Sequence, residues 1–213
     1  MSQAGDPASR PAPAVRKGSA LRWIGRACFI AAAGVAGYLV WVLWGTGLVT
    51  AQAQDDLRAE FEASISDPGP PPPPGEEPVR LAGDAYAELI VPRLDLDVIV
   101  VEGTDTASLT KGPGHYPGTD DPWEDTGRVA IAGHRTTYGH PFWALDKMRP
   151  GDLIRLRTER GTFDYRAVRT QIVPPTATQV ADPTDRPTLI LTTCNPRFSA
   201  AQRLVVFAVR VPA

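Results

Sequence analysis

Thr188-Leu-Ile-Leu-Thr-Thr-Cys194-Asn-Pro196 is an apolar, strand-like run that ends abruptly in a cysteine. Pro196 has no N–H to donate to a sheet, so the strand is expected to stop there and to present the Cys194 thiol at its end. A thiol attacks as the thiolate and therefore needs a proton acceptor and a nearby cation. A lone cysteine on an apolar strand is also commonly a small buried hydrophobe, so Cys194 alone leaves both interpretations open.

Two other residues are candidates for these roles. His134 follows an apolar run, Val129 to Ala132, and so sits at a second strand end, where Gly133 leaves room for close approach. Arg203 follows Cys194 by nine residues and is a permanent cation. An arginine there would favour the thiolate and would bind an oxygen that gains negative charge. The alternative for Arg203 is a solvated charge at a strand end.

The ordinary pKa values set the starting point for such a pair. With about 8.5 for cysteine and 6.5 for histidine, the Cys⁻/His⁺ ion pair amounts to about one per cent of the neutral pair. A third cation nearby would raise that fraction, and Arg135 and Arg197 compete with Arg203 for this role. No carboxylate is placed near these motifs by the sequence.

A metal site is not expected. The other two histidines, His115 and His140, lie in Pro/Gly-rich segments, and the three histidines show no familiar ligand spacing. Cys28 lies in the N-terminal apolar segment, so the region beyond it has one thiol and no thiolate pair.

The region from Ala85 onward predicts an all-β sandwich or barrel, because short runs rich in Val, Ile and Leu alternate with Gly, Pro and Asp. A hairpin is expected around Gly161, and a slip in the alternation near Val168 predicts a β-bulge. A short helix is expected from Pro141 to Met148, and a loop over 112–118. The expected strands are 85–91, 98–102, 127–132, 152–158, 162–173, 188–193 and 203–211.

The N-terminal part predicts a membrane anchor. Residues 1–26 carry five basic side chains against one acidic, and look disordered, whereas residues 27–51 are twenty-five uncharged positions. As a helix they span about 37 Å, enough for a hydrocarbon core of about 30 Å. The positive-inside rule then places the N-terminus in the cytoplasm and the large domain outside. A cleaved secretory signal is the alternative, although its apolar region is roughly 7–15 residues.

Residues 52–84 connect the anchor to the domain at 85–213. Leu57, Phe61 and Ile65 form one apolar helical stripe, which indicates an amphipathic helix or a continuation of the anchor. Five consecutive prolines, Pro70 to Pro74, then predict a semi-rigid polyproline II spacer.

Leu191-Thr-Thr-Cys194, with His134 in a Gly-His motif and Arg203 downstream, resembles the sortase family over roughly residues 85–211. Asn195-Pro196-Arg197 and Tyr138 resemble class E, found in Gram-positive actinobacteria. The resemblance implies an all-β fold, a closed eight-stranded β-barrel with short helices, in which the Cys and Arg strands are neighbours. It implies that His134, Cys194 and Arg203 are catalytic, that Tyr138 and Thr193 contact substrate, and that no cofactor is used.

The function implied is that of a single-pass membrane-anchored cysteine transpeptidase with its catalytic domain outside the cytoplasm. It would cleave a Leu-Ala/Pro-x-Thr-Gly sorting signal between Thr and Gly and join the protein to a peptidoglycan amine. Its partners would be sorting-signal proteins, the peptidoglycan precursor and the membrane, with no nucleic acid. One alternative is an L,D-transpeptidase, which typically holds His and Cys in one short segment, whereas here they lie 60 residues apart. The other is a non-enzymatic, anchored wall-binding β-domain.

Overall fold

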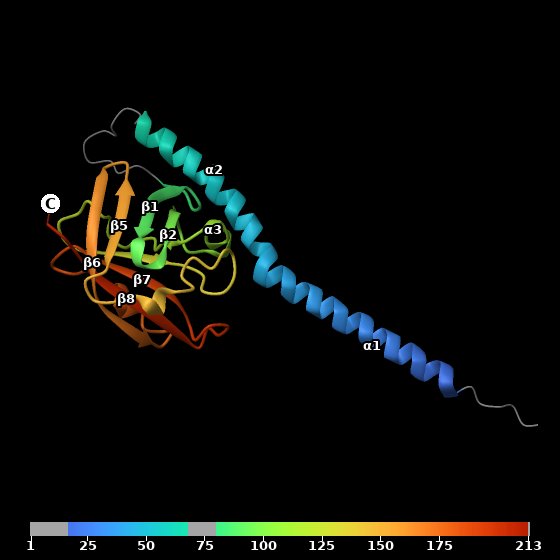
Figure 1. The fold of residues 1–213 in the computed structure, drawn as a ribbon. Helices are drawn as coiled ribbons and strands as arrows, with labels where there is room; N and C mark the ends of the chain where they lie inside the picture. The colour runs from blue at the N-terminus through green and yellow to red at the C-terminus, as the bar shows by residue number, and fades with distance from the viewer. Residues whose placement is uncertain (1–16, 68–79, 213) are drawn as a thin grey trace, which may run out of the picture. The chain divides into compact units, whose positions relative to one another are not determined.

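The computed structural model describes residues 17–67 and 80–212 of the chain (Figure 1). The chain separates into two compact units, one up to Val40 and one from Trp41 onward. Most of the basic segment predicted at 1–26 and nearly all of the proline-rich spacer lie outside the described residues.

Helix α1 (Lys17–Val40) forms the described part of the first unit. Its side chains from Leu21 to Val40 are all exposed, in agreement with the apolar composition that predicts an anchor. The helical run Leu21–Ser66 is, among the described residues, the one long and apolar enough to cross a membrane. Its membrane insertion stays a prediction.

The second unit begins with a π-helical turn (Trp41–Gly45) and helix α2 (Thr46–Ser66). Thr46 and Thr50, which fall inside the predicted membrane segment 27–51, are buried and bond within this unit. The end of the predicted segment, from Thr46 on, is therefore packed against the protein domain, a placement that hydropathy alone does not reveal.

The described residues from Ala85 onward form a closed eight-stranded barrel, as expected, with the strand order β1-β2-β3-β4-β7-β8-β6-β5 (Figure 1). The strands are β1 (Ala85–Val91), β2 (Leu96–Glu102), β3 (Gly114–His115), β4 (Arg128–Ala132), β5 (Leu153–Thr158), β6 (Gly161–Val173), β7 (Thr188–Asn195) and β8 (Gln202–Arg210). The short helices are α3 (Thr106–Lys111) and 3-10 turns at Pro92–Leu94, Leu145–Lys147 and Thr178–Ala181.

Strand β3 differs from the expectation, because it lies inside the segment predicted as a loop. Its two residues close the barrel by pairing in parallel with β2 and antiparallel with β4. A Cβ added at Gly114 would lie 2.0 Å from the carbonyl oxygen of Gly103, so only glycine fits this contact. A strand this short has no periodicity for a sequence pattern to reveal.

The predicted hairpin and β-bulge are confirmed, and the predicted helix at Pro141 to Met148 is confirmed in its buried residues but not in its conformation. β5 and β6 form the hairpin that pairs Thr158 with Gly161, and the register of β6 shifts between Ala167 and Arg169, as the bulge requires. Phe142, Leu145 and Met148 are buried as the predicted helix requires. That segment folds as turns followed by a single 3-10 turn, Leu145–Lys147, instead of a longer helix.

Strand β7 has a hydrophobic cluster on each face. Leu189 and Leu191 belong to the barrel interior, whereas Ile190 belongs to a second cluster on the outer face, with Val205 and Phe207 of β8. The segment that follows β6 covers this outer cluster through Ala177, Val180 and Ala181. Alternating residues of a strand point to opposite faces, so Cys194 shares the outer face with Ile190.

Helix α2 packs on β1 and β2. Leu57 and Phe61 are buried against Ile99 and Val101, which confirms the apolar stripe predicted from the sequence. Both terminal nitrogens of the Arg157 guanidinium, on β5, donate to the Glu62 carboxylate of the helix, over 2.7 and 2.9 Å. The helix that leads into the spacer is thus an integral part of the barrel unit.

Candidate active site

Cys194 and Arg203 are direct cross-strand partners in the antiparallel pair β7–β8. Directly opposed residues project from the same face of a sheet, with Cβ atoms about 4.5–5.5 Å apart. Both residues are partly buried. They lie where β7 ends and β8 begins, because Pro196 terminates β7. The structure therefore brings the predicted nucleophile and the predicted cation together.

The segment that carries His134 lies at the same edge of the barrel, here called the Cys194 rim, on the side of β7 opposite to β8. Strands β4 and β7 are parallel, with Ala132 beside Thr192, and the Gly133 N–H donates to the Thr192 carbonyl oxygen over 3.0 Å. His134 therefore directly follows the bonded end of β4, on the side of β7 opposite to β8. Cys194 thus lies on a strand flanked by β4, which leads into His134, and by β8, which carries Arg203, and its side chain is on the outer face of the barrel.

The Gly-His motif has a packing reason. A Cβ added at Gly133 would lie 2.6 Å from the ring of Phe142, so a larger residue would displace the turn that follows β4. The Phe142 N–H also donates to the His134 carbonyl oxygen over 3.1 Å. Gly133 therefore lets the segment carrying His134 fold back tightly over the end of β4.

The surroundings of His134 favour its neutral form. Burial lowers the pKa of the imidazole below its ordinary value of 6.5. Its Nδ1 lies 3.4 Å from the Thr137 hydroxyl, and its ring is 4.9 Å from that of Tyr138, tilted by 39°. A neutral imidazole at this position can accept a proton from a neighbouring thiol.

Arg203 keeps its charge available at the rim. Its Nη1 donates to the carbonyl oxygens of Ala200 and Gln202 over 3.0 and 3.1 Å. Carbonyl oxygens hold the side chain in place without cancelling its positive charge. The arrangement suits a group that favours a thiolate or binds an oxyanion.

Arg135, which the sequence marks only as a competing cation, turns out to connect the His134 segment to the cysteine strand. Its Nη1 donates to the Cys194 carbonyl oxygen over 3.3 Å and to Asn195 Oδ1 over 2.7 Å. Its Nη2 lies 3.2 Å from Asp146, which also pairs with Arg197 at 3.0 Å. The side chain is buried, so it acts as a structural clamp and offers no cation to a substrate. Its position next to His134 was the sole signal in the sequence.

The two residues expected to contact substrate are placed differently. The Thr193 side chain is buried, faces the barrel interior and donates its hydroxyl to the Gly133 carbonyl oxygen over 2.7 Å. Its hydroxyl therefore ties β7 to the end of β4 and is not available to a substrate, whereas a contact between the Thr193 backbone and substrate stays a prediction. Tyr138 is partly exposed beside His134, and its contact with substrate stays a prediction.

His115 is not a loop residue, contrary to expectation. It is buried in β3, with Nδ1 3.0 Å from Glu102 and Nε2 3.0 Å from the Thr119 hydroxyl. Its ring stacks on Tyr86 with centroids 4.2 Å apart. Both ring nitrogens are thus used in a structural network away from the Cys194 rim.

An apolar cavity of about 210 Å³ adjoins the rim. It includes Arg203 and Thr192 on β8 and β7, and its wall is formed by the segment after β6 together with Tyr116. The cavity lies on the outer face of β7, reaches the site through Arg203, the cross-strand partner of Cys194, and has room for small apolar side chains.

Comparison with protein families matches residues 89–211 to the family described as Sortase domain. Sortase D of Bacillus subtilis is 35% identical over 134 residues, 61% of this chain and 65% of that protein. Sortase SrtE1 of Streptomyces coelicolor is 31% identical over 185 residues, 80% of this chain and 51% of that protein. The chain thus spans about half to two thirds of these curated relatives.

Solved structures agree in fold. A Clostridium perfringens Sortase D5 transpeptidase superposes with a TM-score of 0.65 at 23% identity, covering 76% of this chain and 99% of that one. Sortase E1 from Streptomyces coelicolor, solved with a tripeptide in its active site, gives a TM-score of 0.58 at 30% identity, covering 63% and 92%. The first likeness shows the fold, and the second extends to related sequence.

Proposed function

The chain belongs to the sortase family, and on that premise we propose that it is a cysteine transpeptidase that cleaves a sorting signal and joins the protein to a peptidoglycan amine. The observation that carries the proposal is the position of Cys194, which pairs with Arg203 on β8, while Arg135, the residue after His134, donates to the Cys194 carbonyl oxygen. The family membership supports this function over an L,D-transpeptidase, and the reactivity of the Cys194 thiol distinguishes it from a non-enzymatic wall-binding domain.

The proposed reaction has two steps. The Cys194 sulfur attacks the carbonyl carbon of the signal's Thr while His134 takes the thiol proton. Arg203 stabilises the oxyanion, and the proton passes from His134 to the nitrogen of Gly as the Thr–Gly bond breaks. An amine then attacks the thioester, which forms a new amide bond and returns the thiol. The chemistry uses no cofactor.

The lowered pKa of His134 favours a neutral imidazole in the resting enzyme. A neutral imidazole can accept the thiol proton, so proton transfer is proposed to accompany attack on the substrate. The positive charge of Arg203, directly across from Cys194, then faces the negative charge that develops on the substrate oxygen.

The cavity beside Arg203 supports an extended peptide as the substrate. Its lining is largely apolar, with Val173, Ile190 and Val205 along its floor. We propose that it receives the apolar residue that begins a Leu-Ala/Pro-x-Thr-Gly signal, so that the Thr carbonyl lies at Cys194. Burial of a leucine side chain contributes about 1.5–3 kcal/mol to such binding.

We further propose the class E subtype and a preference for Ala at the second position. Tyr138, next to His134, and the relationship with Sortase SrtE1 support it. Sortase D is similar to a comparable degree, so peptide competition is the deciding measurement.

The proposed location is the cell membrane, with a cytoplasmic N-terminus and the barrel outside. The exposed apolar helix α1 and the basic residues around Lys17 support this orientation. Protease added to wall-free intact cells should remove epitopes beyond Pro78 and spare those before Lys17. Protection of both would refute the orientation.

The decisive experiment for the activity is mass spectrometry of the full chain with a Leu-Ala-x-Thr-Gly peptide and a small amine. The expected products are an acyl-enzyme on Cys194, a peptide cut after Thr and an amide of the added amine. Cys194→Ala should form none of them, and His134→Ala and Arg203→Ala should slow all three. An unmodified chain and an intact peptide for the unaltered protein would overturn the proposal.

A further inference from the structure

The first turn of α2 contacts the segment that carries His134. The Thr46 hydroxyl donates to the Val42 carbonyl oxygen over 2.8 Å and accepts the Tyr138 N–H over 3.1 Å. Because its proton is directed at Val42, the hydroxyl offers a lone pair to Tyr138. These residues lie 92 positions apart, so the contact is purely tertiary.

The backbone at Tyr138, which donates this bond, has a conformation that the surrounding structure must stabilise. Tyr138, Gly139 and His140 have φ values of 50°, 68° and 41°, three left-handed residues in succession. Residues other than glycine adopt such values only when the surrounding structure holds them there. The His140 N–H bonds to the Thr137 carbonyl oxygen over 2.9 Å, which closes the turn but does not anchor it to the barrel.

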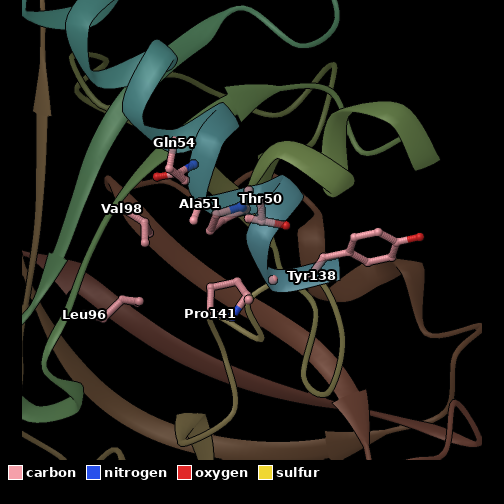
Figure 2. Close-up of a pocket in the computed structure, with 11 residues that line it drawn as sticks. Thr50, Ala51, Gln54, Leu96, Val98, Tyr138 and Pro141 are labelled. Carbon is pink, nitrogen blue, oxygen red and sulfur yellow. The ribbon is translucent and has the colours of Figure 1, made fainter. Parts of the chain in front are cut away.

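Helix α2 supplies a surface for this turn. A Cβ added at Gly139 would lie 3.5 Å from Thr50 Cγ2, and one added at Gly47 would lie 3.7 Å from the Gly139 nitrogen, so helix and turn are about one side-chain carbon apart at these glycines. Figure 2 shows Thr50, Ala51 and Pro141 around a cavity of about 190 Å³, with the Tyr138 side chain pointing away from it. The backbone of Tyr138, and not its ring, therefore meets the helix.

The helix is itself fixed to the barrel close to this contact. The Gln54 amide donates to the carbonyl oxygens of Ile99 and Lys111 over 2.8 and 3.0 Å, and accepts the Ile99 N–H over 2.7 Å. Thr50 donates to the Thr110 carbonyl oxygen over 2.8 Å. Because these bonds hold α2 to β2 and α3, the Thr46 hydroxyl is a fixed reference point for the turn.

We propose that Thr46 is a positioning residue for His134. The turn places the Tyr138 ring 4.9 Å from the imidazole and the Thr137 hydroxyl 3.4 Å from Nδ1, so a displaced Tyr138 backbone would change both contacts. The inference rests on the proposed function, in which His134 transfers the proton. It makes helix α2, whose first turn overlaps the predicted membrane segment, a part of the catalytic apparatus.

The test compares Thr46→Val, Thr46→Ser and Ser64→Ala in the full chain in detergent, each assayed for peptide cleavage. Valine keeps the size and removes the hydroxyl, and the expected result is a fall in kcat of about threefold to tenfold, which corresponds to the loss of one hydrogen bond. Serine should restore kcat. Ser64→Ala is the matched control, because it removes a partly buried hydroxyl from the same helix that bonds to the Phe61 carbonyl oxygen over 2.9 Å, and its kcat should stay near that of the unaltered chain.

A second readout does not depend on activity. NMR titration of the His134 imidazole, assigned with His134→Gln, should show its pKa rising toward 6.5 in Thr46→Val, because a displaced turn leaves the ring less buried. An unchanged pKa and kcat in Thr46→Val would overturn the inference. Equal losses in Thr46→Val and Ser64→Ala would do the same, by showing general destabilisation. Unchanged cleavage in Cys194→Ala or His134→Ala would instead refute the proposed function.

Discussion

The Arg135 guanidinium donates to the Cys194 carbonyl oxygen over 3.3 Å, although the two residues lie 59 positions apart in the chain. Arg135 directly follows His134, so this one bond joins the histidine segment to the cysteine strand. Asp146 pairs with the same guanidinium over 3.2 Å and holds it from the opposite side. The relative position of the proposed nucleophile and base therefore depends on a buried side chain that takes no part in the chemistry.

Replacing Arg135 by lysine should expose this dependence. A lysine keeps the charge but cannot reach the Cys194 carbonyl, Asn195 and Asp146 with one planar group. We expect the free energy of unfolding to fall by about 1–3 kcal/mol and kcat to fall by more than KM changes. Denaturant unfolding and peptide cleavage measure the two effects. A variant with the kcat of the unaltered chain would show that the clamp has no catalytic importance.

Replacing Arg203 by alanine should slow the reaction of Cys194 with a negatively charged alkylating reagent. Arg203 is the direct cross-strand partner of Cys194, so its positive charge attracts an anionic reagent to the thiol, and its loss removes that attraction. Arg203→Lys should lie between the two. The control is Arg197→Ala, because Arg197 is a nearby cation held by Asp146 at 3.0 Å and by the Trp143 carbonyl. A thiol that does not react at all in the native protein would contradict the prediction.

The lowered pKa of His134 predicts a pH-dependent stability. Between the folded-state pKa and the ordinary value of 6.5, the unfolded chain binds more protons at this residue than the folded one. The free energy of unfolding should therefore rise with pH through this window and fall as the pH drops below about 6.5. Denaturant unfolding at pH 7.5 and pH 5.0 should show a larger loss for the unaltered chain than for His134→Gln. Equal losses would mean that His134 is not desolvated.

Tyr138 should influence the choice between Ala and Pro at the second position of the signal. Alanine retains an N–H that proline lacks, and a phenol beside His134 can bond to peptide backbone, a contribution of about 0.5–1.5 kcal/mol. Competing Leu-Ala-x-Thr-Gly and Leu-Pro-x-Thr-Gly peptides should give a kcat/KM that favours Ala several-fold, and Tyr138→Ala should reduce that ratio. Tyr138→Phe separates the hydroxyl from the ring. A preference for Pro in the unaltered domain would contradict the class E proposal.

The sequence by itself determined the elements whose signal is local. The β-branched and leucine-rich runs predict seven strands, the bulge near Val168 and the hairpin at Gly161, because strand periodicity and turn chemistry act over a few residues. The motif around Cys194 identified the family and the three proposed catalytic residues. The spacing of the apolar residues also predicted that Leu57 and Phe61 share one helical stripe, which is buried in the structure.

Tertiary structure alone decided which of these elements meet. Periodicity fixes which side chains of a strand share a face, but it does not say which strands pair or in what register, since those depend on contacts between residues far apart in the chain. That is why the sequence did not predict the pairing of β3, the bond from Thr193 to Gly133 or the clamp that Arg135 forms on Cys194. For the same reason Thr46, inside an apolar run typical of a membrane helix, proved to bond to the turn beside His134. A hydrogen bond across 92 residues depends on the closed barrel and the docked helix, and no local pattern encodes it.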